Sequence, residues 1–328
     1  MNRRLKFWIS NCVALLSCFA FAQASPTSTK SQTKPDIRTL HFPPDVSIGA
    51  LYVVSRVGGL DKPGPSVAAA KGTVTLVVPP DSMVGLELGG KCFQNPALLD
   101  PLKNEPIDSL RISFYSMDDS EEGIVDKAML HVGEMHELQE LLLDRCDATD
   151  KSLEAIAGMP KLFRLSCFNA EVTGSGLGAI TASCPNITDL RLWYCPIQHT
   201  NLKQLGKLKH LESLNVSSTQ LKDDSIECLT TCTGLKWLRI FSNPITNKNL
   251  AKLKALKNLE SLDVTGTKVT IDGLRQLKGM HLHFLSCPFA VGPNYDAELT
   301  ALFPGITLHH QGPPTVKSDD LDLFAPRH

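Results

Sequence analysis

The chain has 328 residues, of which 42% are hydrophobic and 20% are charged, and its formal net charge is −1. This length and apolar content are normal for one large or two ordinary soluble domains, and they exclude a disordered or fibrous chain. The charge balance gives no overall basic excess, so we expect no nucleic-acid partner.

Residues 1–24 have the pattern of a secretory signal peptide. Three basic residues precede a short apolar run, and the run ends at Ala24 in the small-x-small sequence that signal peptidases recognise. The run is short for a membrane span and leads directly into the cleavage pattern. We therefore predict cleavage after Ala24 and a secreted or periplasmic mature chain. The alternative is a lipoprotein signal ending at Cys18, and only then do we expect attachment to a membrane.

The next two segments differ sharply in composition. Residues 25–40 are rich in Ser, Thr, Lys and Pro, which predicts a flexible leader. Within residues 41–82, the β-branched stretches IGALYVVSRV and GTVTLVV predict two strands separated by a connection rich in Gly and Pro. We expect residues 41–82 to form a β cap over the first edge of the following fold.

A repeat of about 24 residues fills the middle of the chain. The stretch LESLNVSSTQLKDDSIECL from Leu211 returns, 48 residues later, as LESLDVTGTKVTIDGLRQL from Leu259. The anchoring apolar residues of the units are Met83, Ile107, Leu138, Leu162, Ile187, Leu211, Leu235, Leu259, Leu282 and Ile306. The steps between them are 24, 31, 24, 25, 24, 24, 24, 23 and 24 residues, and the long step contains the acidic stretch SMDDSEEG. We interpret this stretch as a loop inserted into a solenoid.

Each unit predicts a short strand, a turn and a short amphipathic helix. Apolar residues stand three and five positions after the anchor, as in Leu235, Leu238 and Ile240, which indicates a strand with one buried face. Such a unit buries its strand and its helix only against neighbouring units, so the units must stack. Residues 304–328 lose the periodicity, and there we predict a closing strand followed by a loose tail.

The unit resembles the leucine-rich repeat family, whose pattern is L-x-x-L-x-L-x-x-N/C-x-L. The resemblance covers residues 83–303. Cys146 and Cys195 at the N/C position are most similar to the cysteine-containing subtype, known from F-box adaptors and bacterial secreted repeat proteins, although Ala170 and Thr219 depart from it. The resemblance implies an α/β fold: a right-handed, horseshoe-shaped solenoid with a parallel concave sheet and short helices on the convex side.

The cysteines fit the repeat better than they fit a disulfide framework. Eight lie beyond residue 24: Cys92, Cys146, Cys167, Cys184, Cys195, Cys228, Cys232 and Cys287. All except Cys92 occupy repeat positions that other units fill with core or turn residues. Equivalent positions two units apart are roughly 10 Å apart, beyond the ~7 Å limit for a bridge. We therefore expect buried free thiols, with disulfides as the alternative for an exported chain.

No motif typical of catalysis stands outside the repeat, so we expect no enzyme activity, no cofactor and no metal. The stretch GSGLGA from Gly174 imitates a nucleotide-binding loop, but it aligns with a helix start in the repeat. Five possible zinc ligands lie on neighbouring predicted strands: His281, His283, Cys287, His309 and His310. Because successive strand residues point to opposite faces, at most half of them could converge.

The predicted concave face is rich in aromatic residues and arginines. The third, fifth, seventh and eighth residues of each unit should point into the hollow. The candidate ligand-binding residues are Arg111, Phe114, Arg164, Phe168, Arg191, Trp193, Tyr194, Ser213, Asn215, Ser217, Trp237, Arg239 and Phe241. We expect Trp193 and Trp237 to flank a polar floor, beside positive charge from Arg191 and Arg239.

Trp, Tyr and Arg supply most of the binding energy at protein interfaces, and exposed aromatic clusters are otherwise costly. We therefore predict an exported binding module that recognises a protein partner through its concave face, without catalysis. A cell-wall or surface polysaccharide is the alternative ligand. A purely structural component of the cell envelope is the alternative role.

Overall fold

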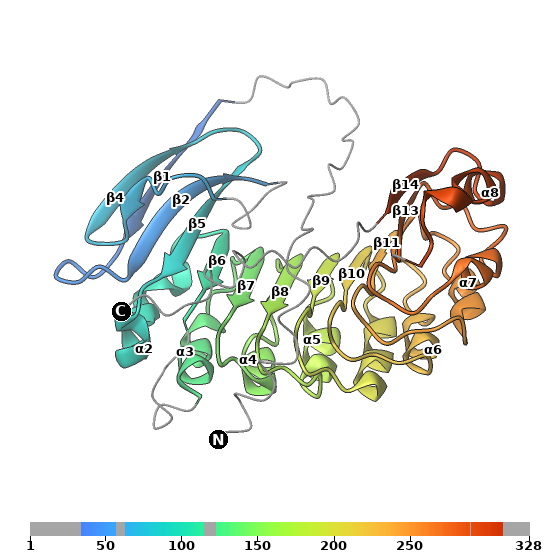
Figure 1. The fold of residues 1–328 in the computed structure, drawn as a ribbon. Helices are drawn as coiled ribbons and strands as arrows, with labels where there is room; N and C mark the ends of the chain where they lie inside the picture. The colour runs from blue at the N-terminus through green and yellow to red at the C-terminus, as the bar shows by residue number, and fades with distance from the viewer. Residues whose placement is uncertain (1–33, 57–62, 115–122, 289, 311–328) are drawn as a thin grey trace, which may run out of the picture.

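The computed structural model describes residues 34–56, 63–114, 123–288 and 290–310. Its main element is a 12-stranded sheet with the order β14-β13-β12-β11-β10-β9-β8-β7-β6-β5-β2-β3. From β5 to β14 every neighbouring pair is parallel. Figure 1 shows the strands along the inner side of an arc and the helices along its outer side. The predictions of an α/β class and of a parallel concave sheet with helices on the convex side are confirmed.

The parallel strands are short and alternate with short helices. The strands are β5 (Ser82–Leu88), β6 (Ser109–Ile112), β7 (Glu140–Asp144), β8 (Arg164–Phe168), β9 (Asp189–Arg191), β10 (Ser213–Asn215), β11 (Trp237–Arg239), β12 (Ser261–Asp263), β13 (Phe284–Cys287) and β14 (Thr307–His310). The α-helices are α2 (Lys91–Gln94), α3 (Ile124–Val132), α4 (Asp150–Ala155), α5 (Leu177–Ser183), α6 (Ser225–Leu229), α7 (Ile271–Arg275) and α8 (Asp296–Leu302). The 3₁₀ helices are η2 (Pro96–Asn104), η4 (His199–Lys207), η5 (Leu250–Ala255) and η6 (Pro293–Tyr295).

The strand register follows the sequence repeat. Leu214 pairs with Leu238 and Leu238 with Leu262, so equivalent leucines stack from unit to unit. These leucines are at most 1% exposed, and burying one such side chain is worth about 1.5–3 kcal/mol. The last step is wrong by one residue: Phe284 pairs with Thr307, a step of 23 rather than 24. Gly305, with a φ of +82°, takes the anchor position there. The predicted anchor, Ile306, is the nearest apolar residue and lies one position later in the chain.

In at least two units, the turn after the strand is closed by a polar side chain at the N/C position of the repeat. The Asn243 side-chain oxygen accepts hydrogen bonds from the backbone N–H groups of Thr219 and Leu221, at 3.1 and 3.0 Å. In another unit the Cys195 thiol donates to the Cys167 carbonyl, at 3.0 Å. Both side chains therefore satisfy backbone groups that a tight turn would otherwise bury unpaired.

The N-terminal cap contains more strands than predicted. Strand β1 (Asp36–His41) pairs antiparallel with β4 (Thr73–Val78) in a separate two-stranded sheet. Strand β2 (Gly49–Ser55) pairs antiparallel with β5 and so extends the main sheet, and β3 (Ala68–Ala69) pairs with β2. Ordered structure thus includes Asp36–Leu40, which the leader prediction assigned to a flexible stretch. The reason is physical: Leu40 is fully buried, although its neighbours have a composition typical of a leader.

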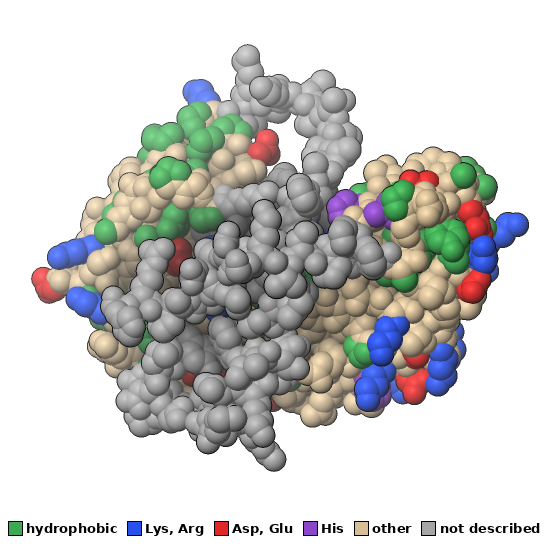
Figure 2. Space-filling view, viewed as in Figure 1, with side chains coloured by type: hydrophobic (Ala, Val, Ile, Leu, Met, Phe, Trp, Pro, Cys, Tyr) green, Lys and Arg blue, Asp and Glu red, His purple; other side chains and the backbone are tan. Residues whose placement is uncertain are grey.

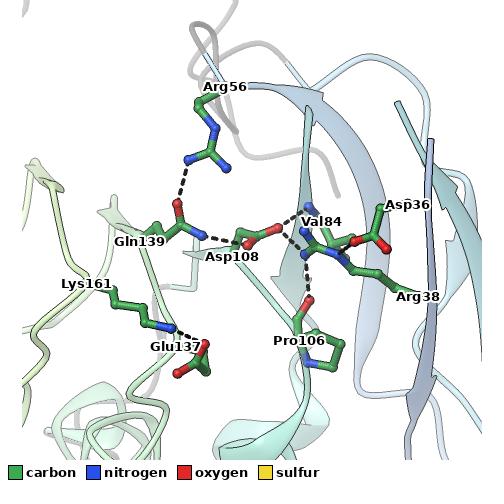
Figure 3. A network of polar contacts seen from close by, with 9 residues as sticks. All are labelled: Asp36, Arg38, Arg56, Val84, Pro106, Asp108, Glu137, Gln139 and Lys161. Carbon is green, nitrogen blue, oxygen red and sulfur yellow. Dashed lines mark hydrogen bonds and ion pairs between the residues drawn. The ribbon is translucent and has the colours of Figure 1, made fainter. Parts of the chain in front are cut away.

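A polar network joins this cap to the first repeats (Figure 3). The Asp108 carboxylate accepts hydrogen bonds from Arg38 at 2.5 Å, from the Val84 backbone N–H at 2.8 Å and from Gln139 at 2.7 Å. Gln139 in turn accepts one from Arg56 at 2.6 Å. Because Asp108 is only 6% exposed, the network fixes the cap to the first edge of the repeat sheet.

Several predictions concern residues outside the described ranges. They are the signal peptide with cleavage after Ala24, the alternative lipid attachment at Cys18, the leader up to residue 33, the inserted loop at residues 116–122 and the tail from residue 311. Among the described residues, none of the helices has the length and the apolar character that crossing a membrane requires.

Candidate binding site on the concave face

A hollow of about 210 Å³ lies on the sheet between β8 and β12. Its lining residues are Phe163, Arg164, Thr188, Asp189, Arg191, Glu212, Ser213, Asn215, Trp237, Arg239 and Ser261. The register explains its position, because Trp237 pairs with Ser213 on one side and with Ser261 on the other. Two small side chains beside the half-buried indole leave room above the sheet. The hollow therefore contains six of the predicted site residues.

A row of hydrogen-bonded charges crosses the sheet beside this hollow. Glu140, which is 0% exposed, accepts a hydrogen bond from Ser109 at 2.9 Å and forms an ion pair with Arg164. Arg164 also bonds Asp189 at 2.9 Å, and Asp189 pairs with Arg191 at 2.8 Å. Third-position residues of neighbouring strands lie directly opposite one another, so opposite charges there pair well.

The pKa of Asp189 reflects this environment. Burial acts to raise it, but the nearby guanidinium groups of Arg191 and Arg164, through charge and hydrogen bonds, lower the pKa overall. Asp189 is therefore ionised at neutral pH and neutralises part of the positive charge beside it.

The positive charge beside the hollow is therefore smaller than the sequence analysis predicted. Arg191 is paired with Asp189, and farther along the sheet Arg111 pairs with Asp144 at 3.1 Å. The lining of the hollow contains three arginines and two carboxylates, Asp189 and Glu212. The formal charge of the lining, three positive against two negative, is +1.

The aromatic residues Phe168, Trp193 and Tyr194 form a cluster of their own and are not part of the lining of the hollow. Trp193 stacks on Phe168, with ring centroids 4.1 Å apart, and Tyr194 meets Phe168 edge-on at 5.8 Å. The Arg145 guanidinium lies 5.3 Å from the Phe168 ring centroid. Trp193 does not line the hollow, so the prediction that Trp193 and Trp237 flank one floor is wrong. Trp193 stands at the seventh position, where its ring reaches the Phe168 ring of the preceding unit.

The backbone after each of the strands β7 to β12 turns through a left-handed residue. Arg145, Asn169 and Tyr194 take the eighth position of their units and have φ values of 49°, 52° and 58°. Such values are uncommon for residues other than glycine. Strands β7 and β8 end at the seventh position and β9 ends at the fifth, so the eighth residue lies in the turn.

Other predicted site residues lie away from the hollow or below the surface. Ser217 is 0% exposed and Asn215 is 7% exposed, and the Asn215 side-chain oxygen accepts from the Ser217 N–H at 3.1 Å. Ser217 is therefore not available as floor. Phe114 stacks on Phe93 of α2, with centroids 4.4 Å apart, and Phe241 is half-buried outside the lining.

Sequence reasoning missed five lining residues. Phe163, Thr188 and Glu212 are second-position residues, which were not assigned to the concave face, whereas Asp189 and Ser261 are third-position residues of the wrong chemical type to be noticed. The second position could have been found, because it follows each anchor immediately and is not apolar in most units.

The cysteines are unpaired, as predicted. All eight described cysteines are buried and free. Burial raises the pKa of the Cys92 thiol to about 11 and that of Cys195 to about 12, which leaves both protonated at neutral pH and unreactive. Cys92 also has a packing role that its sequence position did not reveal, since it donates to the Ile48 carbonyl at 3.3 Å.

The glycine-rich stretch is a helix start. The backbone N–H groups of Gly174 and Gly176 donate to the Asp150 carboxylate, each at 2.9 Å, and α5 follows. An added Cβ at Gly176 would lie 2.6 Å from the Asp150 carbonyl oxygen. Asp150 therefore takes the place that a phosphate would need. Among the described residues, no three potential metal ligands lie together.

The register, the turn closure and the alternation of strand and helix define a leucine-rich-repeat solenoid. No protein-family profile matches the sequence, and a comparison with curated proteins gives no match. Among solved structures, the fold is similar to internalin C2 of Listeria monocytogenes, with 20% sequence identity and a TM-score of 0.45 over 66% of this chain and 84% of that one. It is also similar to an internalin, InlF, of the same organism, with 18% identity and a TM-score of 0.46 over 66% of this chain and 57% of that one.

Proposed function

We propose that this chain is an exported binding module that recognises a protein partner through the hollow between β8 and β12. The observation that carries the proposal is the half-buried Trp237 between Ser213 and Ser261. Its indole offers a large apolar surface at an open site, and tryptophan and arginine are both enriched among the residues that supply most of the binding energy at interfaces.

The lining favours a particular kind of partner group. Arg191 and Arg239 lie on either side of Asn215 in the register, and the lining has a formal excess of one positive charge. An acidic or hydroxyl-rich side chain with a flat or apolar portion fits these contacts, since arginine donates to oxygen while the indole packs against the flat portion. A protein loop that presents such a side chain is the proposed occupant.

Export is supported by the basic residues, the apolar run and the small-x-small sequence of residues 1–24. We expect the mature protein from its native cell to begin at Ser25. Mass measurement of that protein tests this part alone, and a lipid-modified Cys18 as the first residue would contradict it.

Binding is tested with the mature chain as bait on cell-envelope extract from its native cell, followed by titration of the captured partner. Trp237→Ala should weaken binding by about 2 kcal/mol or more, which is the usual loss at an interface hot spot. Ser213→Trp should abolish binding because the new side chain fills the hollow.

A matched control is available in the last strand. Thr307 occupies the third position of β14, equivalent to Ser213, but lies outside the hollow. Thr307→Trp should therefore bind like the unchanged protein. Equal binding by all three variants would contradict a site at the hollow, and capture of a glycan instead of a protein would favour the alternative ligand.

A further inference from the structure

Charge is distributed very unevenly along the solenoid. Residues 84–196 contain 9 Lys and Arg and 18 Asp and Glu, a formal charge of −9. Residues 197–280 contain 13 Lys and Arg and 7 Asp and Glu, a formal charge of +6. The near-zero total thus hides an acidic first half and a basic second half of the repeat array.

The basic excess does not lie on the concave face. Arg239 is the single basic residue within β10, β11 and β12. Most of the lysines instead follow the 3₁₀ helices on the convex side: Lys203, Lys207 and Lys209 in and after η4, and Lys252, Lys254 and Lys257 in and after η5. Figure 2 shows Lys and Arg side chains gathered at the lower right, over the part that Figure 1 colours yellow to orange.

The two lysine groups stand on either side of α6. Lys252 of η5 pairs with Glu227 of α6 at 2.8 Å, and the charge of Lys203 also helps to lower the pKa of Glu227. On the η4 side, a Cβ added to Gly206 would lie 2.7 Å from the Thr231 Cβ. The three helices are therefore immediate neighbours, with α6 in the middle.

Most of these lysines have no carboxylate partner. All six are exposed, and among the described residues only Lys252 of the six lies within ion-pair distance of an acidic side chain. Lys209 donates instead to the Gly206 carbonyl, at 2.9 Å. Because the six lysines outnumber the exposed carboxylates Asp224 and Glu227 beside them, this surface has a positive local potential that attracts extended anions.

The strip between the two groups can accept hydrogen bonds. Thr230 and Thr231 of this strip donate their hydroxyl protons to the carbonyls of Glu227 and Cys228, at 2.7 and 2.8 Å. Their oxygens therefore retain lone pairs for outside donors. A polymer with both anionic groups and hydroxyl groups matches lysines that flank threonines.

We propose that the convex surface formed by η4, α6 and η5 binds a linear acidic polysaccharide, one with carboxylate or sulfate groups. The lysines would contact the anionic groups, and the threonines would accept from the sugar hydroxyls. Single-stranded nucleic acid fits less well, because these three helices contain no Phe, Tyr or Trp for base stacking. A flat bilayer fits less well because the helices line the outside of an arc.

The test uses the mature chain and labelled oligosaccharides of alginate and of heparin, with neutral dextran for comparison. Binding should be observed for the two acidic sugars, weaken as salt is added and be absent for dextran. Lys252→Gln, Lys254→Gln and Lys257→Gln together should weaken binding about tenfold, the sum that three exposed ion pairs of ordinary strength supply.

The matched control removes the same charge elsewhere. Lys91, Lys103 and Lys151 are exposed and lie in the acidic half, so their triple change to Gln should leave binding unchanged within about twofold. An equal loss in both triple variants, the absence of binding, or tighter binding to a DNA duplex or to phosphatidylglycerol vesicles would overturn the proposal. Trp237→Ala should not alter sugar binding, which separates this result from that of the concave hollow.

Discussion

Strands β6 to β9 and strands β10 to β12 belong to one concave sheet, yet they present different surfaces. In the first group the third-position side chains of β7, β8 and β9 are charged and neutralise one another, and Ser109 of β6 donates a hydrogen bond to Glu140. In the second group these positions hold Ser213, Trp237 and Ser261, and the hollow extends over them from the charged residues of β8 and β9.

The comparison shows what decides whether a repeat surface is structural or open. Neighbouring strands are about 4.8 Å apart, so third-position side chains always touch. Where these side chains carry opposite charges, they form ion pairs and hydrogen bonds with one another. Their polar groups are then already used within the protein, and this part of the face is structural. Where a large side chain stands between two small ones, its surface stays available to a partner.

The largest loss of stability is expected from a substitution that interrupts the row of charged residues Glu140, Arg164, Asp189 and Arg191. Arg164→Met leaves the fully buried Glu140 without its cation, and removing one partner of a buried pair typically costs 3–5 kcal/mol, so we expect a loss of about that size. Lys236→Met removes a much more exposed pair with Glu212 and should cost about 1 kcal/mol or less. Urea unfolding of both variants measures the difference.

A double variant controls for lost packing. Arg164→Met combined with Glu140→Met removes both charges and should recover much of the loss, because the buried charge is then no longer unpaired. If the single Arg164→Met variant lost no more free energy of unfolding than Lys236→Met, the row would not be a structural element.

The fold could be predicted from the sequence because a repeat states the same constraint many times. One apolar residue per unit, found again at nearly constant spacing, fixed strand position and register for most units. The prediction was wrong where no repeated apolar pattern was present. Strand β1 has a single buried leucine, Leu40, and Gly305 stands where other units have an apolar anchor. In both places backbone pairing decided the structure, and composition did not reveal it.

The site could be predicted only in part, because the sequence shows which side chains face the hollow but not which of them bind each other. Arg164 and Arg191 were recognised as concave residues, but Asp189 was not recognised as the partner of both, across the strand pair for Arg164 and within β9 for Arg191. Trp193 was assigned to the hollow on strand geometry, yet its ring stacks on Phe168, the equivalent residue of the preceding unit.

A smaller effect on stability is expected when the carboxylates of the charged row are titrated with acid. The pKa values of Asp189 and of Asp150 are lowered in the folded protein: burial opposes this, but ion pairs at Asp189 and hydrogen bonds from Thr173 and Gly176 at Asp150 outweigh it. A carboxylate of this kind stabilises the fold fully above its unfolded pKa of about 3.9, and the contribution is lost as the pH falls through the folded pKa.

Asp189→Asn should therefore be less stable than the unchanged protein near neutral pH, and its free energy of unfolding should fall less steeply below about pH 4. Urea unfolding at a series of pH values measures both slopes. Parallel curves would mean that Asp189 does not gain from its two arginines in the folded state.

The smallest effect distinguishes the two tryptophans themselves. Both are half-buried, but Trp193 has one ring face covered by Phe168, whereas Trp237 lines the hollow. In a chain that starts at Ser25, Trp193→Phe and Trp237→Phe each leave one indole. Iodide should quench Trp237 more strongly than Trp193, because the hollow admits a small anion and its lining has a positive excess. Equal protection of both tryptophans from iodide would mean that the space beside Trp237 is closed. The surface of β10 to β12 would then be no more available to a partner than the charged surface of β6 to β9.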